Sequence, residues 1–127
     1  MKSEDINGRT LETWTAAEVA DALAKREILL IDVRSPQEFM IDHIEGAVLS
    51  PIAFFDATHL PKETDRRIVL HCGSGVRSEK AAIACLEAGF GKIAHMEGGM
   101  AAWKQGGLPY VGTDMASGAP KRMNISA

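Results

Sequence analysis

The sequence predicts an α/β fold in which helices pack on a mostly parallel sheet. Two apolar runs, at 28–31 and 68–72, have the composition of strands that are buried on both faces. Two capping boxes, at 15–18 and 35–38, mark the starts of helices. Strand-like and helix-like segments alternate with short connections along 127 residues, a length that suits one domain.

The first half of the chain is expected to contain two helices, two strands and one helical turn with a loop. In order, these are a helix at 15–25, a strand at 28–31, a helix from 36, a strand at 47–49, and a helical turn with a loop over 52–66. Thr15 accepts from the first turn of its helix, and Asp32 ends the buried strand. Pro36 suits the first position of the second helix, which is short because Gly46 follows.

The second half repeats this alternation. The expected elements are a strand at 68–72, a helix through 81–86 that stops at Gly89, a strand at 92–95, and a helix that starts at 101–103 and stops at Gly106. The glycines at 73 and 75 separate the first strand from the helix that follows it. Residues 112–127, rich in Gly, Ser and Ala, are expected to form a C-terminal tail.

Composition excludes several classes of protein. Hydrophobic residues make up 46% of the chain, which rules out a largely disordered polypeptide. The net charge of −3 argues against nucleic acid or an anionic membrane as the main partner, since both require a basic surface. The sequence shows no membrane span and no apolar leader, so a cytoplasmic location is expected.

The cysteines and histidines do not form a metal-binding pattern. Cys72 and Cys85 could make at most one disulfide, and free thiols are the default expectation. The four histidines show neither ligand spacing nor a neighbouring C-x-x-C motif, so no structural zinc site is expected.

The strongest local signal for chemistry is the run His-Cys-Gly-Ser-Gly-Val-Arg-Ser over 71–78. Cys72 ends a buried strand, and a glycine-broken loop leads into a helix, which is where ligands bind in open α/β sheets. The loop amides, the helix N-terminus and Arg77 all favour a thiolate over a thiol. The same loop would hold an oxyanion or a persulfide. The alternative is a buried structural cysteine beside an ordinary helix start.

Three motifs in this order resemble the rhodanese-like domain family over about residues 10–110. The first is Asp-Val-Arg-Ser-Pro-Gln-Glu-Phe over 32–39 with His-Ile-Glu-Gly-Ala over 43–47. The second is Cys-Gly-Ser-Gly-Val-Arg-Ser over 72–78, and the third is Gly-Gly-Met-Ala-Ala-Trp over 98–103 with Gly-Leu-Pro at 107–109. Asp42 departs from the family, where Gly is usual, and this affects the expected local turn and not the chemistry.

The resemblance implies a three-layer α/β/α sandwich around a five-stranded parallel sheet with strand order 3-2-4-5-1, formed by a single domain over residues 1–111. Its second strand would end at Asp32 and its fourth at Cys72, which makes these residues neighbours. Strand order reverses at this point, so the general rule for ligand sites in open sheets indicates the same place.

The resemblance also implies a sulfurtransferase that moves sulfane sulfur from a donor such as thiosulfate through a persulfide on Cys72. Four residues separate Cys72 from Arg77, which is the loop length of the family's sulfurtransferases. The related phosphatases and arsenate reductases have one residue more. The expected partners are a small-molecule sulfur donor and a thiol or sulfur-carrier protein as acceptor, with no metal or organic cofactor; oligomeric state stays open.

Site roles follow from the same resemblance. Cys72 is the expected catalytic residue, and the expected substrate-binding residues are Gly73, Ser74, Gly75, Val76 and Arg77. Asp32, Arg34 and Ser78 are expected to support the loop. Glu38 and Arg34 are expected in structural ion pairs, and His71 on the sheet face opposite Cys72. The remaining alternatives are a persulfide carrier or interaction module without turnover and, less favoured, a cysteine-dependent phosphatase or arsenate reductase.

Overall fold

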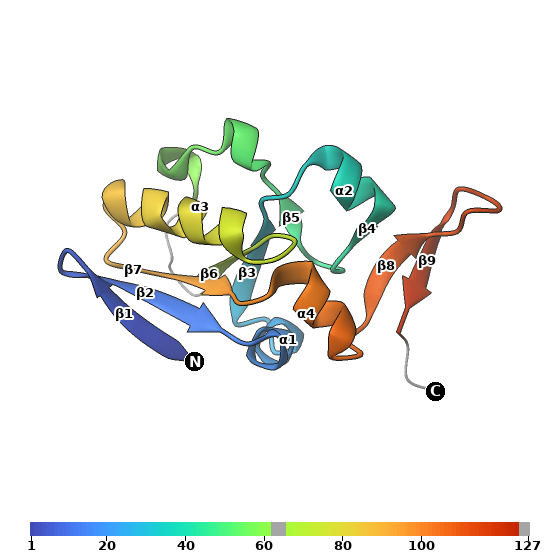
Figure 1. Cartoon of the computed structure of the whole chain (residues 1–127), viewed down its shortest axis with the longest axis horizontal. Coiled ribbons are helices and arrows are strands. Elements are labelled where there is room, and N and C mark those ends of the chain that lie inside the picture. The colour runs from blue at the N-terminus through green and yellow to red at the C-terminus, as the bar shows by residue number, and fades with distance from the viewer. Residues whose placement is uncertain (62–65, 125–127) are drawn as a thin grey trace.

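The centre of the molecule is a six-stranded sheet in the order β1-β2-β7-β6-β3-β5 (Figure 1). The computed structural model describes residues 1–61 and 66–124. The strands of the sheet are β1 (Lys2–Ile6), β2 (Arg9–Trp14), β3 (Ile28–Asp32), β5 (Val48–Leu49), β6 (Arg67–His71) and β7 (Lys92–Met96). A second sheet joins β4 (Asp42–His43), β8 (Tyr110–Thr113) and β9 (Pro120–Met123).

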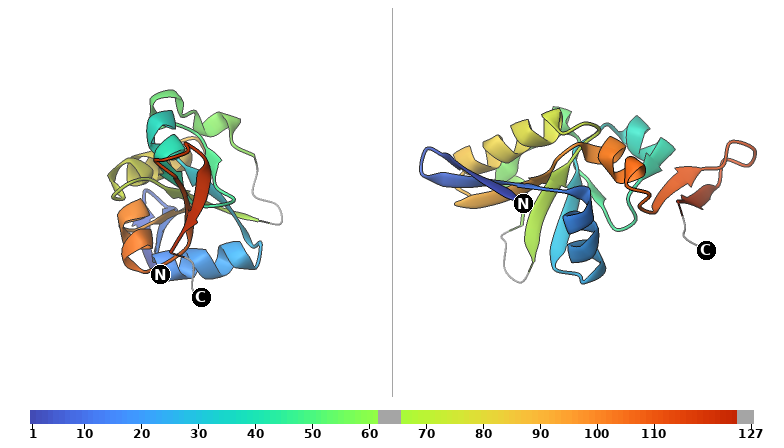
Figure 2. Two further views of the ribbon diagram at one scale, coloured as in Figure 1. Left: turned by 90° about the vertical axis from the view of Figure 1, so that its right-hand side faces the viewer. Right: turned by 60° about the horizontal axis from the view of Figure 1, so that its bottom comes forward.

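Helices cover both faces of the large sheet and make three layers (Figures 1 and 2). The helices are α1 (Ala16–Ala24), α2 (Pro36–Ile41), α3 (Val76–Glu87) and α4 (Gly99–Gln105), with short 3-10 turns η1 (Ile52–Phe54) and η2 (Ala57–His59). One apolar cluster joins the sheet to α3 and η2, and the other joins it to α1 and α4. None of the helices within residues 1–61 and 66–124 is long and apolar enough to cross a membrane.

The predicted α/β sandwich is confirmed, and its parallel strands lie in the expected order. Read in chain order, β2, β3, β5, β6 and β7 give the arrangement 3-2-4-5-1. The sheet has one strand more than the five expected, because β1 adds a sixth, antiparallel strand beside β2. Asn7 and Gly8 connect these two strands with positive φ angles of 52° and 85°, which suits a tight hairpin.

The C-terminal segment differs from the expected tail. β8 and β9 form a hairpin, and β8 also pairs with β4, so the hairpin belongs to the second sheet. Small residues of the kind that suggested a tail, over 116–119, lie at its turn, where Gly118 has a φ of +74°. Residues 125–127, and residues 62–65 of the loop expected over 52–66, lie outside the described residues.

The strand register places the predicted site at one edge of the sheet. Asp32 at the end of β3 is opposite His71 at the end of β6, so Cys72 follows directly at the carboxyl end of the sheet. Both capping boxes form: Thr15 and Ser35 accept from the N3 amides, and Glu18 and Glu38 reach back to the caps. The second box fixes α2 beside this edge.

The start of α4 holds the backbone at Cys72. The amide of Met100 donates to the Cys72 carbonyl at 2.8 Å, and the amide of Ala101 donates to the Gly73 carbonyl at 3.1 Å. Gly99 permits this approach, since a Cβ there would lie 2.4 Å from the Cys72 oxygen and its φ is +55°. The two helix-start amides are thereby committed to the backbone and not to a ligand.

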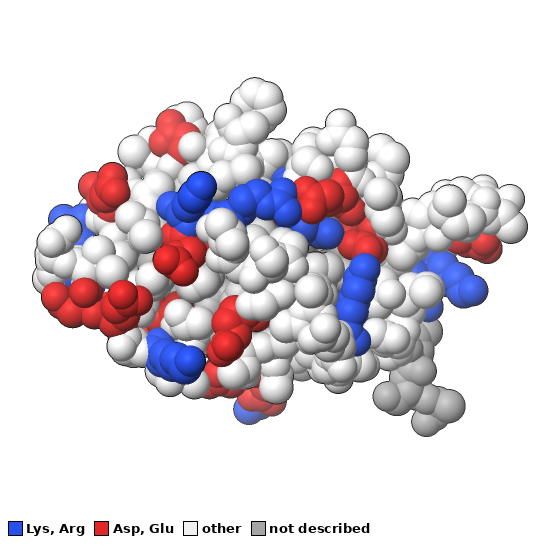
Figure 3. All heavy atoms as spheres, viewed as in Figure 1, with Lys and Arg blue, Asp and Glu red and all other residues white. Residues whose placement is uncertain are grey.

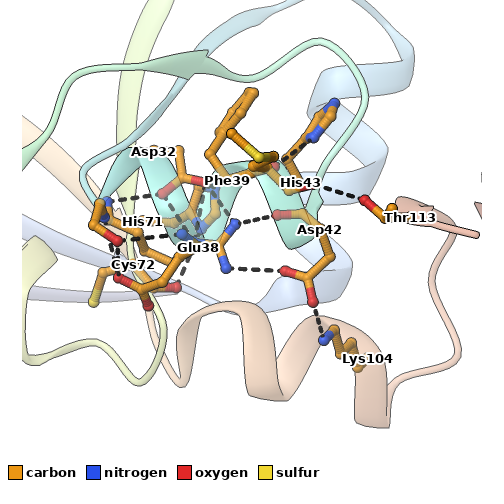
Figure 4. A network of polar contacts seen from close by, with 12 residues as sticks. Asp32, Glu38, Phe39, Asp42, His43, His71, Cys72, Lys104 and Thr113 are labelled. Atoms are coloured by element: carbon orange, nitrogen blue, oxygen red, sulfur yellow. Dashed lines mark hydrogen bonds and ion pairs between the residues drawn. The ribbon is translucent and has the colours of Figure 1, made fainter. Parts of the chain in front are cut away.

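A buried network of charges fixes the end of β3 (Figure 4). Arg34, only 4% exposed, donates to both carboxylate oxygens of buried Asp32 and to the carboxylate and carbonyl of Asp42. Lys104 on α4 pairs with the second oxygen of Asp42. Asp42 has extended backbone, with φ −159°, so a side chain replaces the family's usual Gly without strain and joins α2 to α4.

Replacing Gly99 should therefore destabilise the protein more than replacing a glycine that has a positive φ elsewhere. Gly99→Ala adds a backbone overlap, worth roughly 1–3 kcal/mol, to the conformational cost of about 1–2 kcal/mol. Gly118→Ala is the matched control, because its φ is also positive but no atom lies within 4 Å of the added Cβ. Urea unfolding should show a larger loss for Gly99→Ala; equal losses would contradict the close packing of α4.

Removing Arg34 should leave the buried Asp32 carboxylate without its counter-charge, whereas Asp42 keeps its ion pair with Lys104. We expect Arg34→Met to lower the free energy of unfolding by about 3–5 kcal/mol, since the Asp32 side chain has no access to water. Arg122→Met breaks an ion pair with Glu45 that is 69% and 65% exposed, and should cost under about 1 kcal/mol. Denaturant titration of both variants tests this, and a similar small effect in the two would refute the importance of the buried network.

Candidate active site

Cys72 lies at the floor of a loop that turns its amides inward. We call residues 72–77 the cysteine loop. The Cys72 side chain is fully buried, and its Sγ accepts the backbone N–H of Gly75 at 3.1 Å and that of Ser78 at 3.3 Å. Gly75 has a φ of +105°, which turns its amide back toward the sulfur and begins α3. The sulfur therefore lies at the N-terminus of a twelve-residue helix.

The surroundings of Cys72 favour its ionised form. Burial raises the pKa of the thiol, but hydrogen bonds from the backbone and hydroxyl of Ser78 and from the amides of Gly75 and Ser74 outweigh it, so the pKa is lowered overall. A thiolate is the nucleophilic form of cysteine, so this geometry suits covalent chemistry at sulfur.

Arg77 stands at the mouth of the loop, paired with Glu38. Its guanidinium donates to the two Glu38 oxygens at 2.7 and 2.9 Å, and both side chains are partly exposed. The hydrogen bond from Arg77 lowers the pKa of Glu38 to about 2, with help from Ser35. A bidentate pair occupies only part of the donor set of a guanidinium, so Arg77 still has N–H groups for an anion.

The remaining predicted site residues divide into two groups. Gly73 leaves room for Arg77, since a Cβ there would lie 3.2 Å from its guanidinium, and the Val76 side chain points to solvent at 62% exposure. The structure brings Gly75 and Ser78 to the sulfur. Asp32 and Arg34, expected in a supporting role, lie in the buried network at the end of β3.

His71 lies near Cys72 but does not touch its sulfur. Its ring is buried, with Nδ1 3.3 Å from the Cys72 carbonyl and Nε2 3.6 Å from Asp32 (Figure 4). Burial lowers the pKa of His71, so the ring is neutral at neutral pH. His43 is structural too: its ring stacks on Phe39 and its Nδ1 lies 3.0 Å from the Phe39 carbonyl.

One residue near the sulfur had no place in the sequence-based site. His95 on β7 reaches the Ser78 hydroxyl, with Nδ1 3.0 Å from Oγ. A single histidine in a short strand carries no motif, although strand alternation puts it on the same sheet face as Ile93, toward α3. Lys104 has no local sequence signal either, because its partner Asp42 is 62 residues away in the chain.

The surface around this edge carries both signs of charge. Figure 3 shows basic and acidic side chains interspersed over the face that it presents, without an extended basic area. This pattern agrees with the net charge of −3.

Comparison with known proteins supports the resemblance noted in the sequence. The family model for the rhodanese-like domain matches residues 15–106. A protein of Allochromatium vinosum named "Sulfurtransferase" is 34% identical over 87 residues, covering 67% of this chain and 79% of the relative. The Mycobacterium tuberculosis protein "Probable adenylyltransferase/sulfurtransferase MoeZ" is 43% identical over 106 residues, covering 80% of this chain and 25% of the relative.

Solved structures agree at the level of the fold. A rhodanese-related protein of Thermoplasma volcanium superposes with a TM-score of 0.67 at 25% identity, covering 79% of this chain and 97% of that one. The chain spans half or less of the length of the first curated relatives that it matches. The family model covers most of the chain and the fold agrees with it, so this protein belongs to the rhodanese-like domain family.

Proposed function

We propose that this protein is a sulfurtransferase that carries sulfane sulfur as a persulfide on Cys72. The observation that carries the proposal is the buried Cys72 sulfur, which accepts the amides of Gly75 and Ser78, with the Arg77 guanidinium at the mouth of the loop. The names of two relatives, one matched over 79% of its length, support sulfur transfer.

The proposed reaction has two steps at one sulfur atom. The Cys72 thiolate attacks the outer sulfur of a donor such as thiosulfate; a new S–S bond forms, the donor's S–S bond breaks, and sulfite leaves with its electron pair. A thiophilic acceptor, such as cyanide in a test or a thiol or carrier protein in a cell, then attacks the outer sulfur. The Cys72 thiolate leaves and the enzyme is restored.

The neighbouring residues would serve both steps. Amides of Gly73, Ser74, Gly75 and Val76 line the loop and would stabilise the anionic persulfide, while Arg77 would attract the donor anion. Ser78 donates to the sulfur from its amide, and Asp32 with Arg34 would keep the end of β3 in place. The four residues between Cys72 and Arg77 leave a small ring, which fits one sulfur atom better than a phosphoryl group.

Thiosulfate treatment should add one sulfur atom to the protein, and only at Cys72. We expect intact-protein mass to rise in the wild type and in Cys85→Ser, the matched cysteine control, and to return after cyanide. Cys72→Ser should show no gain, because its hydroxyl replaces the nucleophile. A gain in Cys72→Ser would refute the mechanism.

Other results of this experiment would favour other functions. No gain with thiosulfate or mercaptopyruvate, together with aryl phosphate hydrolysis that is lost in Cys72→Ser, would indicate a phosphatase. A persulfide that forms but passes only to one protein partner would indicate a carrier module.

Changing the charge at the mouth of the loop should change the kinetic constants for an anionic donor such as thiosulfate. Arg77→Ala should lower kcat/KM for thiosulfate by roughly 5–150-fold. This corresponds to the loss of about 1–3 kcal/mol from one charge-assisted hydrogen bond. Glu38→Gln removes the carboxylate that neutralises Arg77 and should lower KM. Glu45→Gln changes the net charge equally, at an exposed ion pair with Arg122, and serves as its control. An unchanged rate in Arg77→Ala would exclude Arg77 from the site.

A further inference from the structure

The Ser78 hydroxyl is the centre of a chain of polar groups that begins in the sheet, and the backbone N–H of the same residue donates to Cys72 Sγ at 3.3 Å. The hydroxyl oxygen lies 3.2 Å from the Gly75 carbonyl and 3.0 Å from Nδ1 of His95. His95 is 4% exposed, and its Nε2 lies 3.4 Å from the hydroxyl of Thr13. Thr13 on β2 and His95 on β7 are direct partners in the sheet.

The location of one proton determines whether this chain of polar groups stabilises the Cys72 thiolate. A serine hydroxyl has a single proton to donate and can accept from other groups. If Ser78 donates to His95, it presents only lone pairs to Cys72, which disfavours a negative sulfur. If Nδ1 of His95 carries the proton and donates to Ser78, the Ser78 proton is free for the sulfur or for the Gly75 carbonyl.

We propose that His95 is a positioning residue, which donates from Nδ1 to Ser78 and so directs the Ser78 proton to the Cys72 thiolate. The proposal rests on the proposed function in that it takes Cys72 as the nucleophile. Thr13 completes the chain, because its hydroxyl can donate to Nε2 of His95 and thereby favour the tautomer with the proton on Nδ1. His95 itself does not touch the sulfur.

The charges around His95 do not disrupt this arrangement. Burial lowers the pKa of His95, whereas the carboxylates of Glu79 on α3, Glu97 after β7 and Glu4 on β1 act in the opposite direction. The ring is thus neutral at neutral pH, where its tautomer matters, and a protonated ring would also donate from Nδ1. Arg77 interacts electrostatically with Cys72, and its guanidinium donates to Glu38.

The test is the pH dependence of Cys72 alkylation by iodoacetamide, followed on the Cys72 peptide by mass spectrometry so that Cys85 does not contribute. The midpoint reports thiolate formation, and the plateau at high pH reports access to the sulfur. His95→Leu should move the midpoint upward and slow alkylation at neutral pH by roughly 3–10-fold, the effect of one neutral hydrogen bond. Ser78→Ala should do the same or more.

Two further variants separate positioning from packing. In the Ser78→Ala background, His95→Leu should have no additional effect on the midpoint, because its path to the sulfur is already cut. His95→Asn should restore much of the wild-type midpoint, since its amide N–H can replace Nδ1 as donor. Equal shifts from His95→Leu in both backgrounds, or a lower melting temperature with an unchanged midpoint, would overturn the proposal.

Thr13→Val keeps the test decisive if the double variant does not fold. It leaves the His95 ring in place and should move the midpoint of the alkylation pH profile in the same direction by a smaller amount. An unchanged midpoint would contradict the proposed role of Thr13 in this chain of polar groups. Alkylation uses no sulfur donor, so the two proposals can fail independently. If the protein takes no sulfur from thiosulfate but shows this coupling, the proposed function fails and the positioning role of His95 stands.

Discussion

The buried Cys72 sulfur, which accepts the backbone amides of Gly75 and Ser78, is the feature on which this edge of the molecule depends. Away from water, a thiolate is stable only where N–H and O–H groups replace its hydration. The cysteine loop supplies them by turning its backbone inward, which requires a φ of +105° at Gly75. The amides of Gly75 and Ser78 then point at the same atom. The direction of the backbone, more than any single side chain, makes the site.

Such a loop cannot hold its shape alone, and two parts of the fold support it. The amides at the start of α4 donate to the carbonyls of Cys72 and Gly73. Arg34 fixes Asp32 at the end of the neighbouring strand. Asp42 joins the two supports, because it contacts both Arg34 and Lys104 of α4.

Local and periodic signals were sufficient to predict most of the helices and strands, whereas the strand order was an expectation from the family resemblance. The apolar runs of β3 and β6, the two capping boxes and the glycine-broken loop after Cys72 are each visible within a few residues of sequence. β1 was missed because its residues are charged and exposed, so no apolar pattern marks it, although Asn7-Gly8 is a turn signal. The roles of His95 and Lys104 depend on which distant elements pack together, and no local pattern encodes that.

The extra strand β1 has a consequence for how the molecule behaves beside its own copies. An open sheet exposes unpaired backbone groups at its two edge strands, and these invite pairing with another chain. At one edge, β1 carries the charges of Lys2, Glu4 and Asp5 on an exposed strand. At the other, β5 offers only Val48 and Leu49, too short a stretch for a stable ladder. Both edge strands of the large sheet therefore disfavour edge-to-edge aggregation.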